Sequence, residues 1–146
     1  MTETPTIFGL PAERGRWGLI ALGLLINLCL GSIYSWSVFV APLAAHFTAA
    51  LGREVAAGEV LLPFSVFLAF FAIAMPLAGK YIERYGPRKV TVAGGLLTGL
   101  GWLLASTATS VEALCVVYGV IGGLGVGIAY GAPVAVAARW FPDRRG

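Results

Sequence analysis

The side chains best suited to chemistry in this chain are uncharged, and they lie inside long apolar runs. Asn27, Tyr34 and Trp36 fall in one run, and Tyr130 falls in another. A tyrosine hydroxyl donates a hydrogen bond from an apolar ring, and such donors suit an anionic or carboxylate ligand in a protein-lined cavity. These four residues are therefore our candidates for a substrate cavity that binds a small carboxylate by hydrogen bonds.

Tyr34 and Trp36 have a second interpretation as aromatic residues of the membrane–water interface. At a rise of about 1.5 Å per residue, Tyr34 lies about 25 Å beyond Trp17, close to the far edge of a hydrocarbon core of about 30 Å. Tyr130 lies only about 15 Å from Trp140, near mid-membrane, where an interfacial role does not explain it. Tyr130 is therefore the stronger candidate.

The apolar runs contain no Asp, Glu, Lys or Arg. A membrane enzyme needs acids, bases or clustered ligands, and a proton relay needs ionisable groups inside the membrane. Cys29 and Cys115 both fall inside apolar runs and are typical of small hydrophobic residues rather than of a disulfide or metal pair. We therefore predict no enzyme activity, no metal site and no cofactor.

Four apolar runs must position the candidate residues. The chain is 58% hydrophobic and only 12% charged, whereas a soluble domain carries about a quarter charged residues. The runs are apolar all round, which excludes the amphipathic helices of a small soluble bundle. Each reaches the roughly 20 residues that cross a bilayer. We predict an all-α integral membrane protein with a tail over 1–16 and transmembrane helices at about 17–45, 60–81, 89–109 and 113–140.

The basic residues predict the orientation of the chain in the membrane. A cytoplasmic N-terminus leaves only Arg53 outside, and it places nine cations inside: Arg14, Arg16, Lys80, Arg84, Arg88, Lys89, Arg139, Arg144 and Arg145. Cytoplasmic loops carry such an excess of Lys and Arg. The chain is thus expected to be a multi-pass protein of the cell membrane, with lipid rather than nucleic acid beside its basic residues.

Glycines at a spacing of four predict close helix packing in the last run. Gly119, Gly123, Gly127 and Gly131 form one slowly drifting stripe, and small residues let two backbones approach in lipid. The same packing is expected of Gly95 and Gly99 in the third run. The prolines inside the runs have two interpretations, kinked movable helices or the ordinary frequency of proline in membrane helices: Pro63, Pro76 and Pro133.

The segment from Gly79 to Val90 resembles a signature of the major facilitator superfamily, found between its second and third helices. In that signature a glycine and three residues precede Asp-Arg, a further glycine and basic residues. Here the matching residues are Gly79, Arg84, Gly86, Arg88 and Lys89, with Glu83 in place of the usual Asp. By this resemblance Glu83 and Arg84 help to hold one conformational state against partner helices, so these residues form a conformational-gate loop.

The segments Leu30–Phe39 and Arg139–Gly146 resemble the oxalate/formate antiporter branch of that superfamily. The resemblance implies two six-helix halves around a midplane site, which carry small organic anions by alternating access. This chain would be helices one to four of the first half. The basic residues that pair with substrate would then lie in the C-terminal half. Ile33 stands where some members have a polar side chain, so the anion stays open.

Other functions remain open from sequence alone. A lactate-like monocarboxylate carrier and a carrier of a non-anionic substrate share the expected fold, and a complete four-helix membrane protein with a structural or assembly role has the same hydropathy. The chain stops in the basic stretch Pro142–Gly146, which is typical of a segment that leads into another membrane span. We therefore expect a truncated chain.

Overall fold

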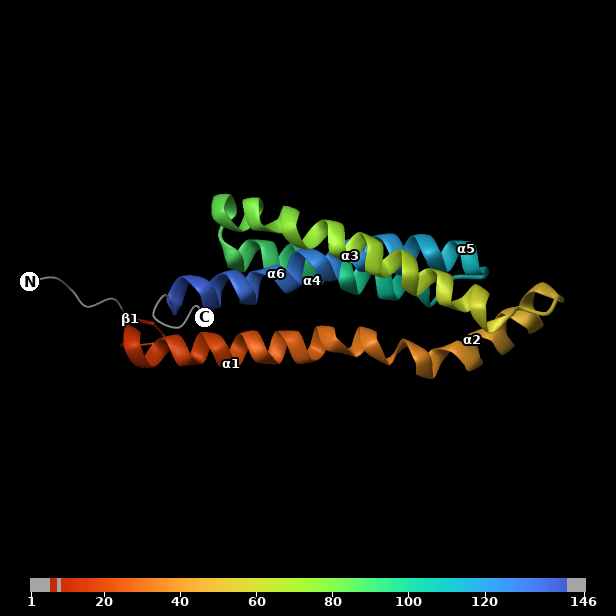
Figure 1. Ribbon diagram of the computed structural model, residues 1–146, viewed down its shortest axis with the longest axis horizontal. Coiled ribbons are helices and arrows are strands. Elements are labelled where there is room, and N and C mark those ends of the chain that lie inside the picture. The colour runs from red at the N-terminus through yellow and green to blue at the C-terminus, as the bar shows by residue number, and fades with distance from the viewer. Residues whose placement is uncertain (1–5, 8, 142–146) are drawn as a thin grey trace, which may run out of the picture.

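The computed structural model describes residues 6–7 and 9–141, which form an elongated bundle of helices aligned along one axis (Figure 1). A short antiparallel ribbon of β1 (Thr6–Ile7) and β2 (Leu10–Pro11) precedes the first helix. The predicted C-terminal continuation, Pro142–Gly146, lies outside the described residues. The described part of the chain is thus almost entirely helical, as predicted.

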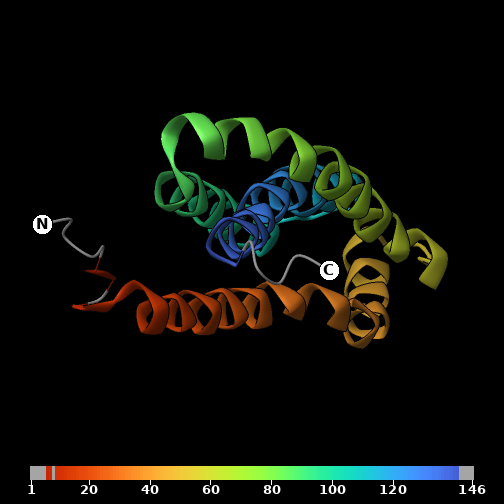
Figure 2. The ribbon, with the colours of Figure 1, turned by 60° about the vertical axis from the view of Figure 1, so that its left-hand side comes forward.

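The first helical segment is longer than predicted and is interrupted. It consists of α1 (Ala12–Leu30), the 3-10 turn η1 (Gly31–Ser35) and α2 (Trp36–Leu51). Gly52, at φ +64°, ends α2 in the left-handed conformation typical of a helix C-terminus. Figure 2 shows that α2 turns away from the direction of α1. The prediction of one helix over 17–45 missed the 3-10 turn because hydropathy does not distinguish the two helix types.

The next helix, α3 (Ala57–Tyr85), begins with side-chain hydrogen bonds rather than with a polar N-cap residue. The Glu59 carboxylate accepts a hydrogen bond from the backbone N–H of Ala56 at 3.2 Å. It also forms an ion pair with Arg53 at 2.9 Å. The first of these contacts is half of a capping box. The hydrogen bond to Glu59 also raises the pKa of Arg53 above its ordinary value. These contacts close the loop that joins α2 to α3.

The predicted loop after the second helix is reduced to one residue. The helix α3 continues to Tyr85 and α4 (Pro87–Ala105) begins directly after Gly86, which has φ +84° and ψ 154°. Such a backbone conformation is nearly restricted to glycine, and proline is preorganised for the first helical position. The predicted boundaries 81 and 89 were therefore wrong: most of the gate-loop residues belong to helix ends.

Replacing Gly86 by Ala should destabilise the fold by about 2 kcal/mol, because a Cβ disfavours this backbone conformation. Thermal unfolding in detergent measures the loss. The control is Gly79→Ala, since Gly79 lies within α3 and no atom of another described helix lies within 4 Å of the position that a Cβ would take there. That control should match or slightly exceed the wild-type stability. An equal loss in both variants would contradict the role of the turn.

The last helical segment contains a stretch of π-helix. It consists of α5 (Val111–Leu114), η2 (Cys115–Gly122) and α6 (Gly123–Trp140). The Ser110 side chain caps it by accepting the N–H of Ala113 at 3.1 Å, so the helix starts slightly before the predicted residue 113. The π-helical stretch is long for a conformation that usually forms single-turn bulges.

Glycines of this segment lie directly against α3. A Cβ at Gly123 would lie 2.6 Å from the Phe67 carbonyl oxygen, and one at Gly127 would lie 2.7 Å from that of Phe71. Gly119 and Gly131 face the same helix at 3.1 Å from the Pro63 oxygen and 3.4 Å from the Met75 oxygen. The stripe therefore allows the backbones of α3 and α6 to approach in a way that side chains would prevent.

A second set of glycines joins α4 to the same segment, and here one prediction was wrong. Cβ atoms at Gly94 and Gly101 would lie 2.7 Å from the Ala129 nitrogen and 2.8 Å from the Gly122 nitrogen. Gly95 and Gly99, which were expected to pack, have no atom of another described helix within 4 Å of the position that a Cβ would take. Two pairs of glycines on one helix can face opposite sides, and spacing alone does not tell which side meets a neighbour.

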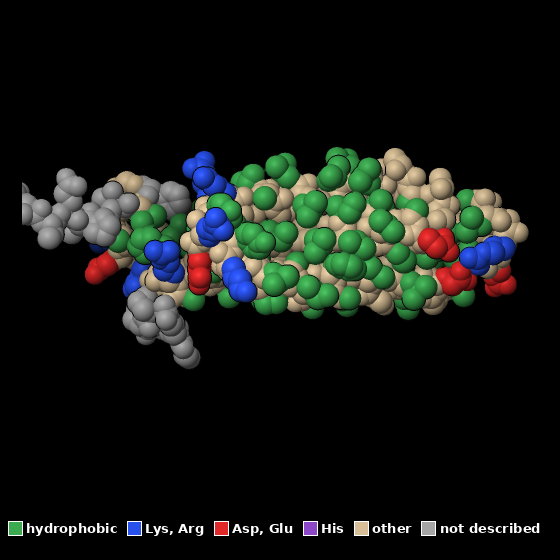
Figure 3. Space-filling model, turned by 90° about the horizontal axis from the view of Figure 1, so that it is seen from above, with side chains coloured by type: hydrophobic (Ala, Val, Ile, Leu, Met, Phe, Trp, Pro, Cys, Tyr) green, Lys and Arg blue, Asp and Glu red, His purple; other side chains and the backbone are tan. Residues whose placement is uncertain are grey.

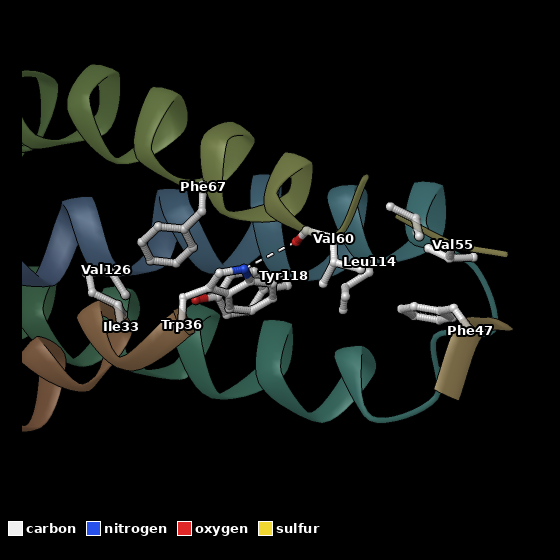
Figure 4. Packing of buried hydrophobic residues seen from close by; sticks show 10 residues of the cluster. Ile33, Trp36, Phe47, Val55, Val60, Phe67, Leu114, Tyr118 and Val126 are labelled. Atoms are coloured by element: carbon white, nitrogen blue, oxygen red, sulfur yellow. Dashed lines mark hydrogen bonds between the residues drawn. The ribbon is translucent and has the colours of Figure 1, made fainter. Parts of the chain in front are cut away.

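The largest cluster of buried side chains fills the end of the bundle near α2 and α5 (Figure 4). The Trp36 ring stacks on Tyr118 at 4.5 Å, and Tyr118 stacks on Phe67 at 5.0 Å. The Trp36 indole N–H donates to the Val60 carbonyl oxygen at 3.2 Å, in the helical turn before Pro63. Aromatic stacking and this buried hydrogen bond thus hold the start of α2, directly after the 3-10 turn, against α3.

Three helical segments of the described chain are long and apolar enough to cross a membrane: Ala12–Leu51, Ala57–Tyr85 and Val111–Trp140. The helix α4 is not among them, because its 19 residues begin with Pro87, Arg88 and Lys89. The third of the four predicted spans, at about 89–109, therefore stays a proposal. Figure 3 shows charged side chains at both ends of the molecule and a hydrophobic surface between them, as a bilayer-spanning bundle requires.

Candidate functional site

The helices α1 and α6 lie side by side, and the start of α1 lies next to the end of α6. The Arg16 Nη1 atom donates a long hydrogen bond to the Trp140 carbonyl oxygen at 3.5 Å, and its guanidinium lies 4.6 Å from the centre of the Phe141 ring. Trp17 meets the same ring edge-on at 5.3 Å. Aromatic rings of this kind collect at a membrane interface. This end of the helix pair therefore marks one boundary of the apolar layer.

Asn27 and Tyr130 lie at the same depth below that boundary. Each is about 15 Å along its helix from the Trp17 or Trp140 position, which corresponds to the middle of a hydrocarbon core of about 30 Å. The two helices also touch between this level and the boundary, since a Cβ at Gly23 would lie 3.2 Å from the Pro133 Cβ. The fold thus brings two predicted site residues from distant parts of the sequence to one level.

The surroundings of these two side chains are compatible with ligand binding. The Oδ1 atom of Asn27 is buried and has no hydrogen-bond partner among the described residues. Tyr130 is half-buried, and its ring meets that of Phe71 from α3 edge-on at 5.5 Å. A buried polar atom without a partner costs free energy. This level of the bundle therefore offers an amide and a hydroxyl in otherwise apolar surroundings.

The structure separates Tyr34 from this level. Tyr34 lies in the 3-10 turn η1, and 61% of its surface is exposed. An exposed ring about 25 Å from Trp17 fits both interpretations made from sequence, the interfacial belt and the outer part of a cavity. Its assignment to the cavity stays a prediction.

Trp36 lines a cavity of about 480 Å³ between η1, α2, α4 and η2. Its side-chain N–H already bonds to Val60. Two hydroxyls of the wall are also engaged, since Ser32 donates to the Cys29 carbonyl oxygen at 2.8 Å and Ser106 donates to that of Leu103 at 2.6 Å. This cavity therefore offers aromatic surface more than free hydrogen-bond donors.

Sequence reasoning missed Tyr118 and Trp102, which line that cavity with Trp36. Tyr118 has the same signal that singled out Tyr130, an isolated tyrosine in an apolar run. The periodicity of the run does not show that Tyr118 stacks on a tryptophan from another helix. A rule that treats every tyrosine in an apolar run as a candidate would have found it.

Replacing Trp36 by Phe should cost about 1 kcal/mol of stability, because it removes the buried hydrogen bond to Val60 and leaves that carbonyl without its donor. Thermal unfolding in detergent measures the change. Trp102→Phe is the control, since Trp102 lines the same cavity but has 43% of its surface exposed. If both variants lost the same stability, ring size rather than the hydrogen bond would explain the effect.

A second polar site lies at the basic end of the bundle, the end where Arg16 meets Trp140. Glu83 near the end of α3 and Arg139 near the end of α6 line one cavity of about 610 Å³, together with Pro87 of α4. Both charged side chains are exposed, and no ion pair joins them within the described residues. A carboxylate and a guanidinium on two helix ends can pair if these ends move together.

The other residues of the predicted gate loop do not line this cavity. Gly79 and Arg84 lie in α3, Gly86 forms the turn, and Arg88 and Lys89 begin α4. The Arg84 guanidinium lies over the Tyr85 ring at 5.3 Å. No group of three or more His, Cys, Asp or Glu within the described residues could hold a metal ion.

Comparison with known proteins identifies relatives of this chain. A family model described as Major Facilitator Superfamily matches residues 12–146. The chain is 33% identical over 134 residues to "Uncharacterized MFS-type transporter YhjX" of Escherichia coli (strain K12), covering 92% of this chain and 32% of that protein. It is 33% identical over 132 residues to "Oxalate:formate antiporter" of Oxalobacter formigenes, covering 90% and 30%.

Eukaryotic relatives share the same region. The chain is 29% identical over 140 residues to "Monocarboxylate transporter 1" of Mus musculus, covering 94% of this chain and 27% of that protein. The chain thus spans about a third or less of the length of these curated relatives.

Proposed function

The chain belongs to the major facilitator superfamily, and on this basis we propose that it is part of a secondary active carrier of small organic anions. Members of this family are transporters, and relatives of this chain are named for oxalate, formate and monocarboxylates. We propose that residues 17–146 form the first four of twelve transmembrane helices, with α4 as the third. The carrier works by alternating access around a midplane site.

The observation that supports this proposal is the position of Asn27 and Tyr130 at about the same depth along two helices that touch, α1 and α6. Substrate sites of such carriers lie near the bilayer midplane, at the interface of the two halves. The Asn27 amide and the Tyr130 hydroxyl supply hydrogen-bond donors there, and they come from two adjacent helices. Cations that balance the charge of the anion would come from helices beyond this chain, since α1, α3 and α6 carry no charge at that depth.

The basic end is proposed to act as the conformational gate. When the site faces the opposite side of the membrane, this end must close, and closure brings Glu83 and Arg139 within reach of each other and of partner helices. When the site opens to this side, the cavity between them fills with water. The separation of the two charges by a cavity of about 610 Å³ supports this proposal.

The proposed orientation places the N-terminus and the Gly86 turn in the cytoplasm. Most of the Lys and Arg side chains gather at one end of the molecule, and a smaller group of charges of both signs lies at the other (Figure 3). Arg53 pairs with Glu59 in the loop between α2 and α3. The excess of Lys and Arg on the cytoplasmic side of membrane proteins supports this choice. Modification of single cysteines from outside intact cells tests it, and labelling of an Arg84→Cys variant would reverse the assignment.

Counterflow of small carboxylates tests the function. The full-length protein would be reconstituted into liposomes preloaded with unlabelled oxalate or formate, and uptake of labelled oxalate would be followed. Uptake that depends on the preloaded anion is expected. Uptake into liposomes preloaded with lactate instead would distinguish a monocarboxylate carrier from an oxalate/formate carrier. Failure of every small carboxylate to drive uptake, with correctly inserted protein, would overturn the proposal, including the anionic substrate class.

A further inference from the structure

A groove separates α3 from α4 near the basic end of the bundle, and α6 forms its floor. Its volume is about 440 Å³. Small side chains make it deep: Ala74 and Ala78 of α3 are almost fully buried, and Ala93 faces them from α4. Leu77 and Tyr81 form its outer wall, with 51% and 58% of their surfaces exposed. The groove is therefore an apolar channel that opens on the outer surface of the described bundle.

The groove is closed at one end by the Gly86 turn, and its charged lining residue lies there. Lys89 lines the groove together with Tyr85, and no described carboxylate forms an ion pair with it. A cation in the first turn of a helix is unfavourable with the helix dipole. The excess of cations at this end accounts for a basic residue at position 89, and the Lys89 charge would attract a negatively charged ligand at the mouth of the groove.

The size of the groove limits what can occupy it. A helix with its side chains is about 10 to 12 Å across, so 440 Å³ would hold only about one turn of helix. A flexible hydrocarbon chain is not limited by the diameter of a helix. An apolar groove in the membrane that ends at a cation matches a molecule with an apolar tail and an anionic head.

We propose that this groove binds one anionic phospholipid, with an acyl chain between α3 and α4 and its phosphate at Lys89. The tyrosine rings of Tyr81 and Tyr85 stack on each other at 6.4 Å and lie at the same end, as aromatic residues do at the headgroup level. Figure 2 shows the helices α3 and α4 meeting at this end beside α6. The occupant is a lipid of the surrounding leaflet and not a segment of protein.

Lipid titration followed by native mass spectrometry tests the proposal. The purified full-length protein in detergent would be titrated with phosphatidylglycerol and, separately, with phosphatidylcholine of the same acyl chains. The first bound phosphatidylglycerol should have about fivefold to tenfold higher affinity than phosphatidylcholine, as expected for one cation near an anionic headgroup. Lys89→Gln should remove this preference and leave phosphatidylcholine binding unchanged.

Two further variants separate the groove from general surface charge. Lys80→Gln removes one exposed cation from the same end but outside the groove, and it should retain the preference. Ala93→Phe places a ring in the groove and should weaken the first binding step for both lipids; Ala93→Leu replaces it if the Phe variant does not fold.

Three results would overturn the proposal. Equal affinity for the two lipids would show that the groove does not select an anionic headgroup. Equal loss of the phosphatidylglycerol preference in the Lys80 and Lys89 variants would indicate diffuse surface charge. Displacement of the lipid by soluble glycerol phosphate alone would indicate a site for a free anion. None of these measurements depends on transport, so the lipid site and the proposed carrier function can fail independently.

Discussion

Replacing Gly127 by Val should destabilise the bundle by about 3 kcal/mol, the largest effect that we expect of a single substitution on its stability. A Cβ at this position would lie 2.7 Å from both the Phe71 carbonyl oxygen and the Ala74 Cβ. Both neighbours belong to the rigid helix α3, so neither can move away alone. The two helices must separate, and chemical unfolding in detergent measures the cost.

The matched control is Gly95→Val. Gly95 also lies inside an apolar helix, but no atom of another described helix lies within 4 Å of the position that its Cβ would take. Its substitution changes helix propensity by the same amount and creates no close contact. The difference between the two variants therefore isolates helix packing. Similar stabilities for both would show that α3 and α6 are not held at so short a distance.

The physical reason for the size of this effect is the membrane. Lipid is as apolar as the helix surfaces, so the hydrophobic effect does not drive helices together there. Close van der Waals contact between backbones remains as a main source of association. Gly123 and Gly127 approach α3 most closely through its backbone carbonyls, so added side chains remove the contact that holds the pair together.

Replacing Tyr130 by Phe should weaken anion transport by the full-length protein about tenfold or more, with an unchanged level in the membrane. The substitution removes only the hydroxyl, and a hydrogen bond to a charged ligand contributes about 1.5–3 kcal/mol. Initial rates of counterflow over a range of substrate concentrations measure it, and the effect should appear mainly as a higher KM. The ring contact with Phe71 stays possible in the variant.

Tyr118→Phe is the control for this prediction. It removes the same atom from the same helical segment, at the aromatic stack with Trp36 and Phe67 instead of at mid-membrane depth. Transport by this variant should equal that of the wild type. Unchanged transport by Tyr130→Phe would return Tyr130 to the residues that only pack, and Asn27→Leu would then test whether this level of the bundle binds substrate at all.

Membership of the major facilitator superfamily was predicted from short motifs and is confirmed by the family match over residues 12–146. The motif residues near Glu83 carry that prediction because their order is unusual between two apolar runs. Their conformation was not predicted, since the chain continues as helix through Glu83 and Arg84 to Tyr85. A motif identifies relatives, whereas the single-residue turn depends on the backbone angles of Gly86.

The sequence by itself determined the membrane class, the helical content and the gathering of positive charge at one end, because these follow from composition and from the spacing of charges along the chain. Only the tertiary structure decided that Gly94 and Gly101 pack while Gly95 and Gly99 do not, and that Asn27 and Tyr130 lie at one depth. It also revealed the groove that ends at Lys89. The physical reason is that a helix repeat specifies which residues share a face, but the neighbour of each face depends on contacts between helices far apart in sequence.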